Sequence, residues 1–393
     1  MHFNSPKIWY PLIPFSWLYG IVVYIRNFLF DCGILPSSSY DMPVISIGNI
    51  TVGGTGKTPL TEYLVRLLSP NHQVGIVSRG YKRKTKGTII ASSSSKMSDI
   101  GDEPYQMKHK YPQVHVVVDE SRCRGIEKIC SPQILPATDV VLLDDAFQHR
   151  YVQPGISIVL MDYNRMPYND YLLPAGRLRE PKSSCERADI VIVTKCPTDI
   201  TPTEEHGIER SLSLQPWQKL YYTHYEYKDL RPMSWYMPGS SNVSGFMESE
   251  SVSGGITLEE LSSNKYRVVL LTGIASPHQL EEDFGKFCPF TAIRFDDHHS
   301  FTPEDIKKIW HKITSVGGDS LANTIVVTTE KDAVRLADYH LNNPSDEVPF
   351  IQNRFSNFFV LPVEVKFKKG LEEDFNKIIS GFVSKNSRTS RLF

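Results

Sequence analysis

Short apolar runs alternate with amphipathic stretches along most of the chain. The runs have the length of buried parallel strands, and stretches with a helical period, such as Thr58–Leu68 and Glu120–Cys130, lie between several of them. This alternation predicts an α/β fold with a mostly parallel, doubly wound sheet. The runs that predict strands are Val44–Ile47, Val74–Val77, Val114–Val118, Val140–Leu143, Ile156–Met161 and Ile190–Val193.

The alternation is interrupted at residues 232–256, which show no periodicity and are rich in Ser and Gly. This composition is typical of an exposed connection or insertion. Strand patterns resume at Arg267–Thr272, Thr291–Phe295 and Thr324–Thr328, so we expect a second, smaller α/β lobe. The expected division is an N-terminal segment at 1–36, an α/β core at 37–230, the Ser/Gly-rich connection at 231–258 and a C-terminal lobe at 259–393.

The N-terminal segment differs from the rest of the chain because residues 8–25 carry no charge. Pro11 and Pro14 break its first half and Arg26 ends it, so its length is at the lower limit for a membrane span. Its aromatic residues are of the types that settle among lipid headgroups: Trp9, Tyr10, Trp17, Tyr19 and Tyr24. We therefore favour a membrane-associated helix that lies in the interface. A true span and a helix docked on the protein's own core are the alternatives.

The composition, with 40% hydrophobic and 22% charged residues, is that of a folded protein. A formal net charge of −1 gives no general attraction to nucleic acid, so we expect no nucleic-acid partner. The six cysteines are scattered, without a C-x-x-C pair or a metal-ligand spacing. This usage indicates a reducing compartment and argues against a structural zinc site.

A glycine-rich segment between a predicted strand and a predicted helix gives the strongest chemical signal. Its residues are Thr51, Val52, Gly53, Gly54, Thr55, Gly56, Lys57 and Thr58. The glycines let consecutive N–H groups turn toward a triphosphate, and the following helix N-terminus adds partial positive charge. Lys57 can reach the β- and γ-phosphates, and the Thr58 hydroxyl suits Mg²⁺. We therefore expect ATP and Mg²⁺ here, although Thr51 stands where the common pattern has its first glycine.

Two carboxylates follow another predicted strand. Asp144 and Asp145 end the run Val140–Leu143, and the carboxyl ends of parallel strands open onto the ligand crevice. A carboxylate at that place can hold Mg²⁺ directly or through water, and the alternative is helix capping. Gln148 and His149 follow in a dense polar cluster, which could orient an acceptor or tune the carboxylates.

Two further clusters carry groups suited to acid–base chemistry. Asp102 lies in Gly101-Asp-Glu-Pro104, where it is either a helix cap or the general base for an acceptor hydroxyl. Asp296-Asp-His-His-Ser300 pairs histidine with carboxylate ahead of a helix start, which suits a proton relay or a metal-ligand cluster. Adjacent histidines in an extended loop point to opposite sides, so we expect only one of His298 and His299 to be catalytic.

Two basic segments complete the set of candidates. Arg79 and Tyr81 follow a predicted strand end, and the loop Leu172–Pro181 contains Arg177, Arg179 and Glu180. Arginine forks match phosphate oxygens bidentately, so we expect phosphate or acceptor contacts rather than solvated charged turns. Glu180 is a candidate for the metal or nucleotide network.

These segments together resemble the tetraacyldisaccharide 4′-kinases, the lipid A 4′-kinases of Gram-negative envelopes. The blocks follow the family's order, and the aromatic N-terminal segment is similar too. The matching blocks are Ile47–Pro59, Ser78–Tyr81, Gly101–Pro104, Leu143–His149, Leu173–Pro181, Asp297–His299 and Thr329–Asp332. Thr51 is in keeping with the family, whereas Ala146 and Arg177 stand where glycine and proline are expected.

The resemblance implies that ATP, with Mg²⁺, phosphorylates the 4′-hydroxyl of an acylated glucosamine disaccharide 1-phosphate in lipid A biosynthesis. It implies two α/β lobes, a membrane surface as partner, and the cytoplasmic face of the bacterial inner membrane; no obligate protein partner is expected. Asp102 and His298 would be the catalytic dyad, with His299 still open. Thr58, Asp144, Asp145 and Glu180 would form the metal site. The substrate-side residues would be Asn49, Arg79, Tyr81, Gln148, His149, Arg177 and Arg179.

Two other function classes use a similar phosphate loop. A P-loop GTPase or metallochaperone would carry an [NT]-K-x-D motif, but the nearest segment, Thr194–Pro197, has proline at the carboxylate position. A non-catalytic nucleotide-binding membrane adaptor would need no Asp–His pair. The residues therefore favour a kinase over both.

Overall fold

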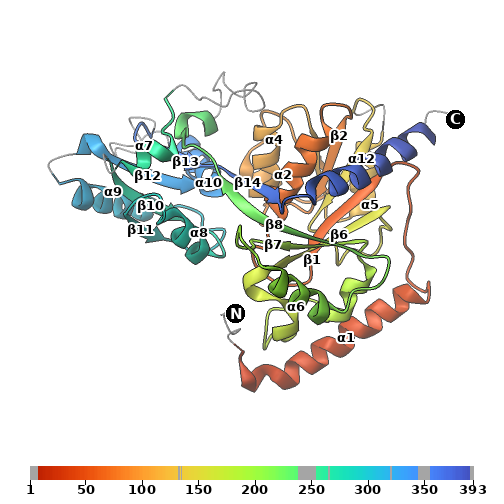
Figure 1. Cartoon of the computed structure of the whole chain (residues 1–393). Helices are drawn as coiled ribbons and strands as arrows, with labels where there is room; N and C mark the ends of the chain where they lie inside the picture. Colours follow the sequence, from red (N-terminus) through yellow and green to blue (C-terminus); the bar gives the residue numbers. More distant parts are fainter. Residues whose placement is uncertain are drawn as a thin grey trace.

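The computed structural model describes residues 8–131, 133, 135–237, 254–263, 266–318, 321–343 and 355–389. In this part of the chain, two sheets of nine and five strands build two lobes that lie side by side (Figure 1). The prediction of an α/β fold with a second, smaller lobe is confirmed. Most of the expected Ser/Gly-rich connection, residues 238–253, lies outside the described residues.

Nine strands form the larger sheet: β1 (Val44–Asn49), β2 (Val74–Ser78), β3 (Ile89–Ile90), β4 (His115–Val118), β5 (Val140–Asp144), β6 (Ile156–Asp162), β7 (Ile190–Thr194), β8 (Lys219–Tyr227) and β14 (Val363–Phe367). Their order is β14-β8-β7-β6-β1-β5-β2-β4-β3. Neighbours from β8 to β4 pair in parallel, and the two outermost pairs are antiparallel. All six apolar runs predicted before residue 200 form strands of its parallel centre.

Helices cover both faces of this sheet because its strands send alternate side chains into two cores. On β1, Ile45 packs in one core with Leu60 of α2 (Lys57–Leu68), and Val44 packs in another with Ile126 of α5 (Arg122–Ile129). The sheet is thus doubly wound, as the buried strand pattern predicts. The other helices around it are α3 (Met97–Ile100), α4 (Asp102–Lys110), α6 (Pro202–Leu212) and α12 (Glu372–Thr389).

The smaller lobe has a sheet in the order β11-β10-β12-β13-β9, parallel except for the last pair. Each of the three apolar runs predicted there forms a strand. The strands are β9 (Arg231–Pro232), β10 (Arg267–Thr272), β11 (Phe290–Arg294), β12 (Thr324–Thr329) and β13 (Phe358–Leu361). The helices are α7 (Leu258–Ser262), α8 (Pro277–Phe284), α9 (Pro303–Gly317) and α10 (Glu330–Asn342).

The chain crosses between the lobes along two paired strands. β8 leaves the larger sheet, and β14 returns to it antiparallel to β8, so that α12 packs on the larger lobe (Figure 1). There the Phe367 ring lies 4.5 Å from Phe375 and 5.1 Å from Tyr63. The C-terminal lobe expected at 259–393 therefore ends before β14. The sequence does not reveal this return because pairing with β8 is a long-range contact.

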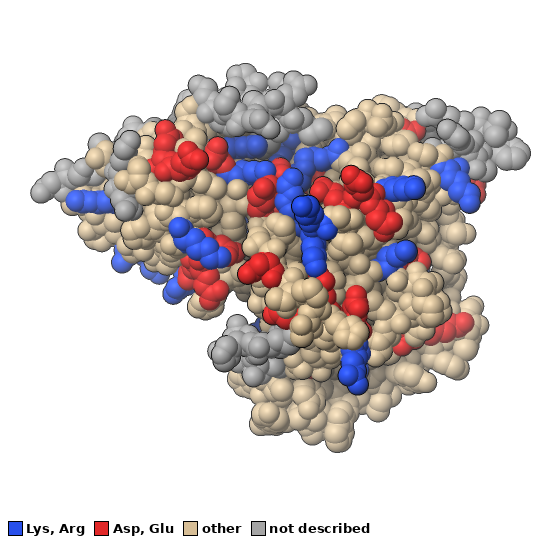
Figure 2. Space-filling model, viewed as in Figure 1, with Lys and Arg blue, Asp and Glu red and all other residues tan. Residues whose placement is uncertain are grey.

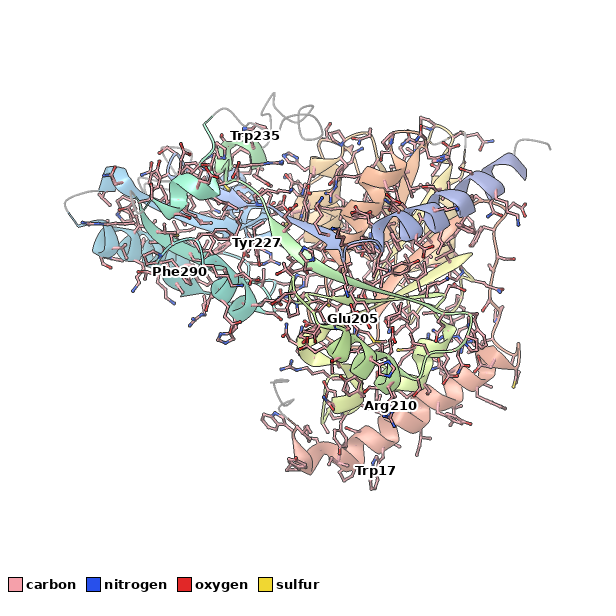
Figure 3. All side chains as sticks on the ribbon, viewed as in Figure 1. Trp17, Glu205, Arg210, Tyr227, Trp235 and Phe290 are labelled. Carbon is pink, nitrogen blue, oxygen red and sulfur yellow. The ribbon has the colours of Figure 1, made fainter. Side chains whose placement is uncertain are left out.

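The helix α1 (Ile13–Asp31) turns two polar and two apolar residues toward the protein, and most of its other apolar residues face outward. Ser16 and Asn27 are buried, whereas Trp17 is 70% exposed and Ile21 56% exposed. Figure 3 shows Trp17 on the outer side of the helix, and the corresponding surface in Figure 2 is almost without charge. The segment Tyr10–Asp31 is long and apolar enough to cross a membrane. A helix docked for its own burial would hide this face, which is exposed in this structure.

Candidate active site

The phosphate loop joins the end of β1 to the start of α2. Gly53 and Gly56 have φ values of 107° and 88°, in the left-handed region that glycine adopts without strain. Thr51 needs no such backbone, because it forms an antiparallel bridge with Leu178. Inside the loop, the Asn49 side chain donates to Oγ1 of Thr55 at 2.7 Å. The first residue of the loop is thus held by pairing with the segment around Leu178.

A buried cluster holds the phosphate loop from the ends of β6 and β7. Nζ of Lys195 and a guanidinium nitrogen of Arg165 both donate to the carbonyl of Gly54, at 2.5 and 3.4 Å, and both pair with Asp162. Thr194 donates to the carbonyl of Thr55 at 2.8 Å. These contacts keep the carbonyl dipoles away from a bound phosphate, which the loop N–H groups attract. Sequence reasoning did not assign this role, although Thr194-Lys195 at a strand end was a visible signal.

Asp144 and Asp145 lie beside the loop in contrasting environments. Asp144 is buried, and burial together with the charges of Glu103 and Asp145 raises its pKa to about 7. Asp145 lies 3.4 Å from Nζ of Lys57 and 3.2 Å from Arg179. Burial acts to raise the pKa of Asp145, but these two cations lower it to about 2. Two cations therefore compensate Asp145, whereas the charges of Lys57 and Arg122 offset the burial of Asp144 only in part.

The environment of Asp144 fits a divalent cation. Its Oδ2 accepts a hydrogen bond from Ser78, and its buried Oδ1 has no hydrogen-bond partner among the described residues. The Thr58 hydroxyl at the start of α2 is buried as well. No three His, Cys, Asp or Glu side chains converge on one metal position in the described part of the chain. A cation here would thus rest on few protein oxygens and on phosphate oxygens, as Mg²⁺ commonly does.

Glu180 is buried but faces α1. Its Oε2 accepts hydrogen bonds from Arg187 at 2.6 Å and Asn27 at 3.4 Å, and its Oε1 lies 4.0 Å from Arg26. Within the described residues, no hydrogen bond or ion pair links it to Thr58. Its contacts are those of a group that positions α1 against the loop Leu172–Pro181.

Asp102 and His298 meet across the two lobes. Nδ1 of His298 lies 2.7 Å from Oδ2 of Asp102, which also accepts a hydrogen bond from Arg335 at 2.7 Å. The other oxygen, Oδ1, accepts from the backbone N–H of Glu103. Burial acts to raise the pKa of Asp102, but the His298 hydrogen bond and the charges of Lys331 and Arg335 hold it far below its usual value. Asp102 is therefore a fixed anion that orients an imidazole.

His299 has a different partner from its neighbour. Its Nε2 lies 2.8 Å from Asp305, and its ring stacks on Phe295 with the centroids 4.7 Å apart. The left-handed backbone of His298, with φ 57°, turns the two side chains apart. The Tyr81 ring lies 5.1 Å from the His298 ring, which brings one predicted substrate-side residue to this pair.

The remaining predicted residues spread around the loop. Gln148 donates to the backbone oxygen of Asn49 at 2.6 Å, and His149 accepts from the backbone N–H of Arg122. Arg79 is exposed, and Arg177 meets the loop through its backbone oxygen, which accepts from Val52. Sequence reasoning also missed Arg122, whose buried guanidinium donates to the backbone oxygen of Asp144 at 2.9 Å. A charged residue inside a short helix pattern gave no signal for this role.

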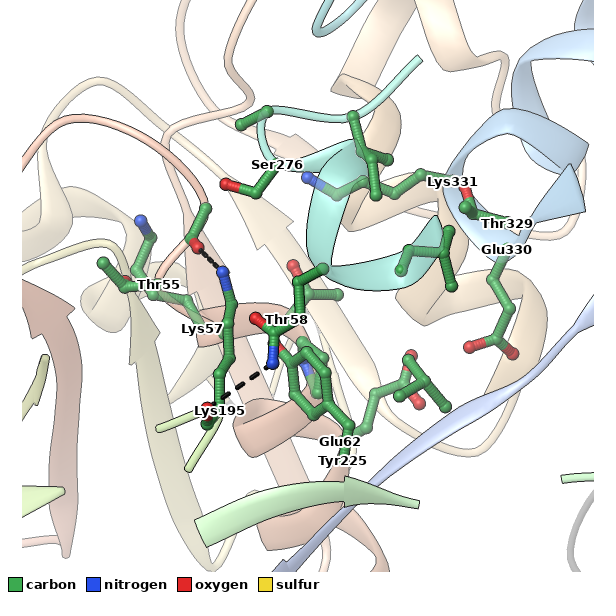
Figure 4. A pocket seen from close by; sticks show the side chains of 18 of the residues that line it. Thr55, Lys57, Thr58, Glu62, Lys195, Tyr225, Ser276, Thr329, Glu330 and Lys331 are labelled. Atoms are coloured by element: carbon green, nitrogen blue, oxygen red, sulfur yellow. Dashed lines mark hydrogen bonds between the residues drawn. The ribbon is translucent and has the colours of Figure 1, made fainter. Parts of the chain in front are cut away.

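A pocket between the lobes contains the phosphate loop (Figure 4). Glu103 and Asp297, the neighbours of Asp102 and His298 in the chain, also line it. The larger lobe contributes Gly54–Thr58, Glu103 and Lys195, and the smaller lobe contributes Ser276 and Lys331. Figure 4 shows Lys57 and Lys195 on one side and Lys331 on the other. The apolar part of its wall comes from Tyr225, Tyr227, Ile274, Leu280, Leu361 and Val363. A phosphate-binding end joined to an apolar wall suits a nucleotide.

Comparisons with known proteins agree with this geometry. A family model described as LpxK, tetraacyldisaccharide-1-P 4′-kinase, matches residues 8–380. The tetraacyldisaccharide 4′-kinase of Phocaeicola vulgatus is 45% identical over 398 residues, covering 100% of each chain, and that of Bacteroides thetaiotaomicron is 44% identical over 99% of this chain and 96% of its own. A crystal structure of LpxK from Aquifex aeolicus, described as an "apo" form in complex with ATP, has a TM-score of 0.66 at 29% identity and covers 95% of this chain and 98% of that one.

Proposed function

Because the chain belongs to the tetraacyldisaccharide-1-P 4′-kinase family, and is thus a kinase with a hydroxyl acceptor, we propose that it transfers the γ-phosphate of ATP, with Mg²⁺, to the 4′-hydroxyl of an acylated glucosamine disaccharide 1-phosphate. One observation carries the proposal: the residues next to the Asp102–His298 pair in the chain, Glu103 and Asp297, line the same pocket as the phosphate loop. A nucleotide switch or an adaptor has no need of such a pair.

In the proposed reaction the phosphate loop and Lys57 bind the β- and γ-phosphates. Thr58 and Asp144 would hold Mg²⁺, with Asp145 beside them, and the metal would neutralise the charge on the phosphates. Asp102 keeps its negative charge and orients His298 through Nδ1, which leaves Nε2 for the acceptor. His298 Nε2 takes the hydroxyl proton as the acceptor oxygen bonds to the γ-phosphorus, and the bond from that phosphorus to the β-phosphate oxygen breaks to release ADP.

The lipid part of the proposal is supported by α1. Its exposed apolar face offers a membrane surface, and its polar face contacts the loop Leu172–Pro181: the Tyr19 hydroxyl donates to the backbone oxygen of Arg179 at 2.8 Å. The same side of α1 reaches Gln148, whose backbone oxygen accepts from Arg26 at 2.5 Å. We place the protein at the cytoplasmic face of the bacterial inner membrane, where ATP and a lipid acceptor meet.

The direct test is transfer of label from γ-labelled ATP to the acylated disaccharide 1-phosphate in detergent, with and without a chelator of Mg²⁺. We expect a labelled bis-phosphorylated lipid only when Mg²⁺ is present. GTP in place of ATP should be a poor donor, because proline occupies the carboxylate position of the guanine motif. An absence of labelled lipid with an active, folded protein would refute the proposed acceptor.

A further inference from the structure

Lys331 is a cation of the smaller lobe that reaches the phosphate-binding end of the pocket. It is the second residue of α10, and it lines the pocket opposite Lys57 (Figure 4). Nζ of Lys331 donates to Oε1 of Glu103 at 2.5 Å. The same oxygen lies 3.3 Å from the hydroxyl of Thr58, a phosphate-loop residue. One carboxylate oxygen thus bridges the phosphate loop and an ammonium group of the other lobe.

Oε1 of Glu103 lies at a position that also suits a phosphate oxygen. A carboxylate resembles a phosphoryl group in charge and in hydrogen-bond acceptance, and its donors here are a loop hydroxyl and a lysine. The side chains of Lys331 and Glu103 remain 23% and 20% exposed, because both face the pocket. The carboxylate of Glu103 therefore occupies a place that an anionic ligand can compete for.

Lys331 keeps its charge in this setting. Burial acts to lower its pKa, but the carboxylates of Glu103 and Asp102 raise it above its usual value. Glu330, the preceding residue, forms a more deeply buried ion pair with Lys110 at 2.6 Å. The side chains of Lys110 and Glu330 are only 9% and 6% exposed, so this second pair is suited to holding α4 against α10. The lobes are thus tied together without Lys331.

We propose that Lys331 is a catalytic residue whose ammonium group moves from Glu103 to the transferring phosphoryl group and stabilises its charge in the transition state. The inference rests on the proposed kinase function. Charge spreads over the three equatorial oxygens of the phosphoryl group during transfer, and enzymes of this kind place a cation there that the phosphate loop does not supply. Glu103 holds the lysine in place before the nucleotide binds. No electron or proton transfer is required of Lys331.

The test combines steady-state kinetics with binding of a transition-state mimic to the full-length protein. We expect Lys331→Met to lower kcat by about a hundredfold or more, with a much smaller change in KM for ATP. The affinity for ADP with Mg²⁺ and aluminium fluoride should fall by a similar factor, and that for ADP alone by less than about threefold. If Lys331 had only a structural role, the substitution would lower the affinity for the mimic and for ADP alone by similar factors.

Two controls make the result decisive. Lys307→Met removes an exposed lysine of α9 and should leave kcat unchanged, and Lys331→Gln serves if the Met variant unfolds early on heating. A Lys331 variant that folds and keeps kcat and mimic affinity near those of the wild type would overturn the inference. Failure of the proposed function would show differently, since the wild type itself would then leave the lipid unlabelled.

Discussion

Nδ1 of His298 lies 2.7 Å from Oδ2 of Asp102, although 196 residues separate them in the chain. The aspartate begins α4 on the larger lobe, and the histidine follows β11 on the smaller one. Arg335 of α10 donates to the same oxygen and fixes it. The pair therefore depends on how the two lobes pack against each other, because each lobe supplies one of its members.

Asp102→Asn and His298→Ala should each lower kcat by about 10²–10⁴-fold, because an oriented imidazole needs both members. The kcat of the double variant should be little lower than that of the less active single variant, since the two residues act as one unit. Nucleotide affinity, measured by calorimetry, should remain near that of the wild type in all three. Losses that multiply would show that the residues act separately.

Lys195→Met should raise KM for ATP by about tenfold, equivalent to about 1.4 kcal/mol, because the Gly54 carbonyl loses its closest donor. KM for the lipid should change little, since Lys195 contacts Gly54 and Asp162 at the phosphate-binding end of the pocket. Lys219→Met, at the exposed start of β8, is the matched control and should behave as wild type. Equal changes in both KM values would mean that Lys195 supports the fold rather than the loop.

Trp17→Glu and Ile21→Glu should each weaken binding to phospholipid vesicles by about tenfold or more, because burial of one large apolar side chain contributes about 1.5–3 kcal/mol. Co-sedimentation with vesicles measures this, and nucleotide affinity should be unchanged. Trp217→Glu replaces a tryptophan outside α1 that is 64% exposed, and it should bind vesicles as wild type does. Full vesicle binding by both α1 variants would place the membrane contact elsewhere.

The stability of the protein should depend on pH through His149. Its pKa is lowered to about 4, from 6.5, by burial and by the charges of Arg122, Arg26 and Arg79. Between pH 6.5 and 4 the unfolded state binds a proton that the folded state does not, so this residue reduces the free energy of unfolding as the pH falls.

His149→Gln removes this group and should show a smaller loss of stability over the same pH range in urea unfolding. As the pH is lowered, the free energy of unfolding should therefore fall more for the wild type than for the variant. Parallel pH profiles for the two proteins would contradict the assignment.

Local patterns account for a large part of the fold. The run Val140–Leu143 and its neighbours were recognised as strands because a strand buried on both faces must be apolar throughout. The edge strand β14 was not recognised, because Val363–Phe367 mixes polar and apolar residues and pairs with β8, which is far away in the chain. Its return to the larger sheet gives the two lobes a double connection that no local pattern encodes.

The candidate site divides in the same way. The sequence by itself determined the phosphate loop, the carboxylates at the end of β5 and the apolar helix. Each depends on neighbours in the chain: the freedom of glycine, the end of a strand, or a run without charge. Only the tertiary structure decided which groups meet. In the folded protein His298, rather than His299, contacts Asp102. Glu180 faces α1, Lys195 contacts Gly54 and Lys331 contacts Glu103. The physical reason is that these are contacts between different strands and lobes, whose distances depend on how the whole chain packs.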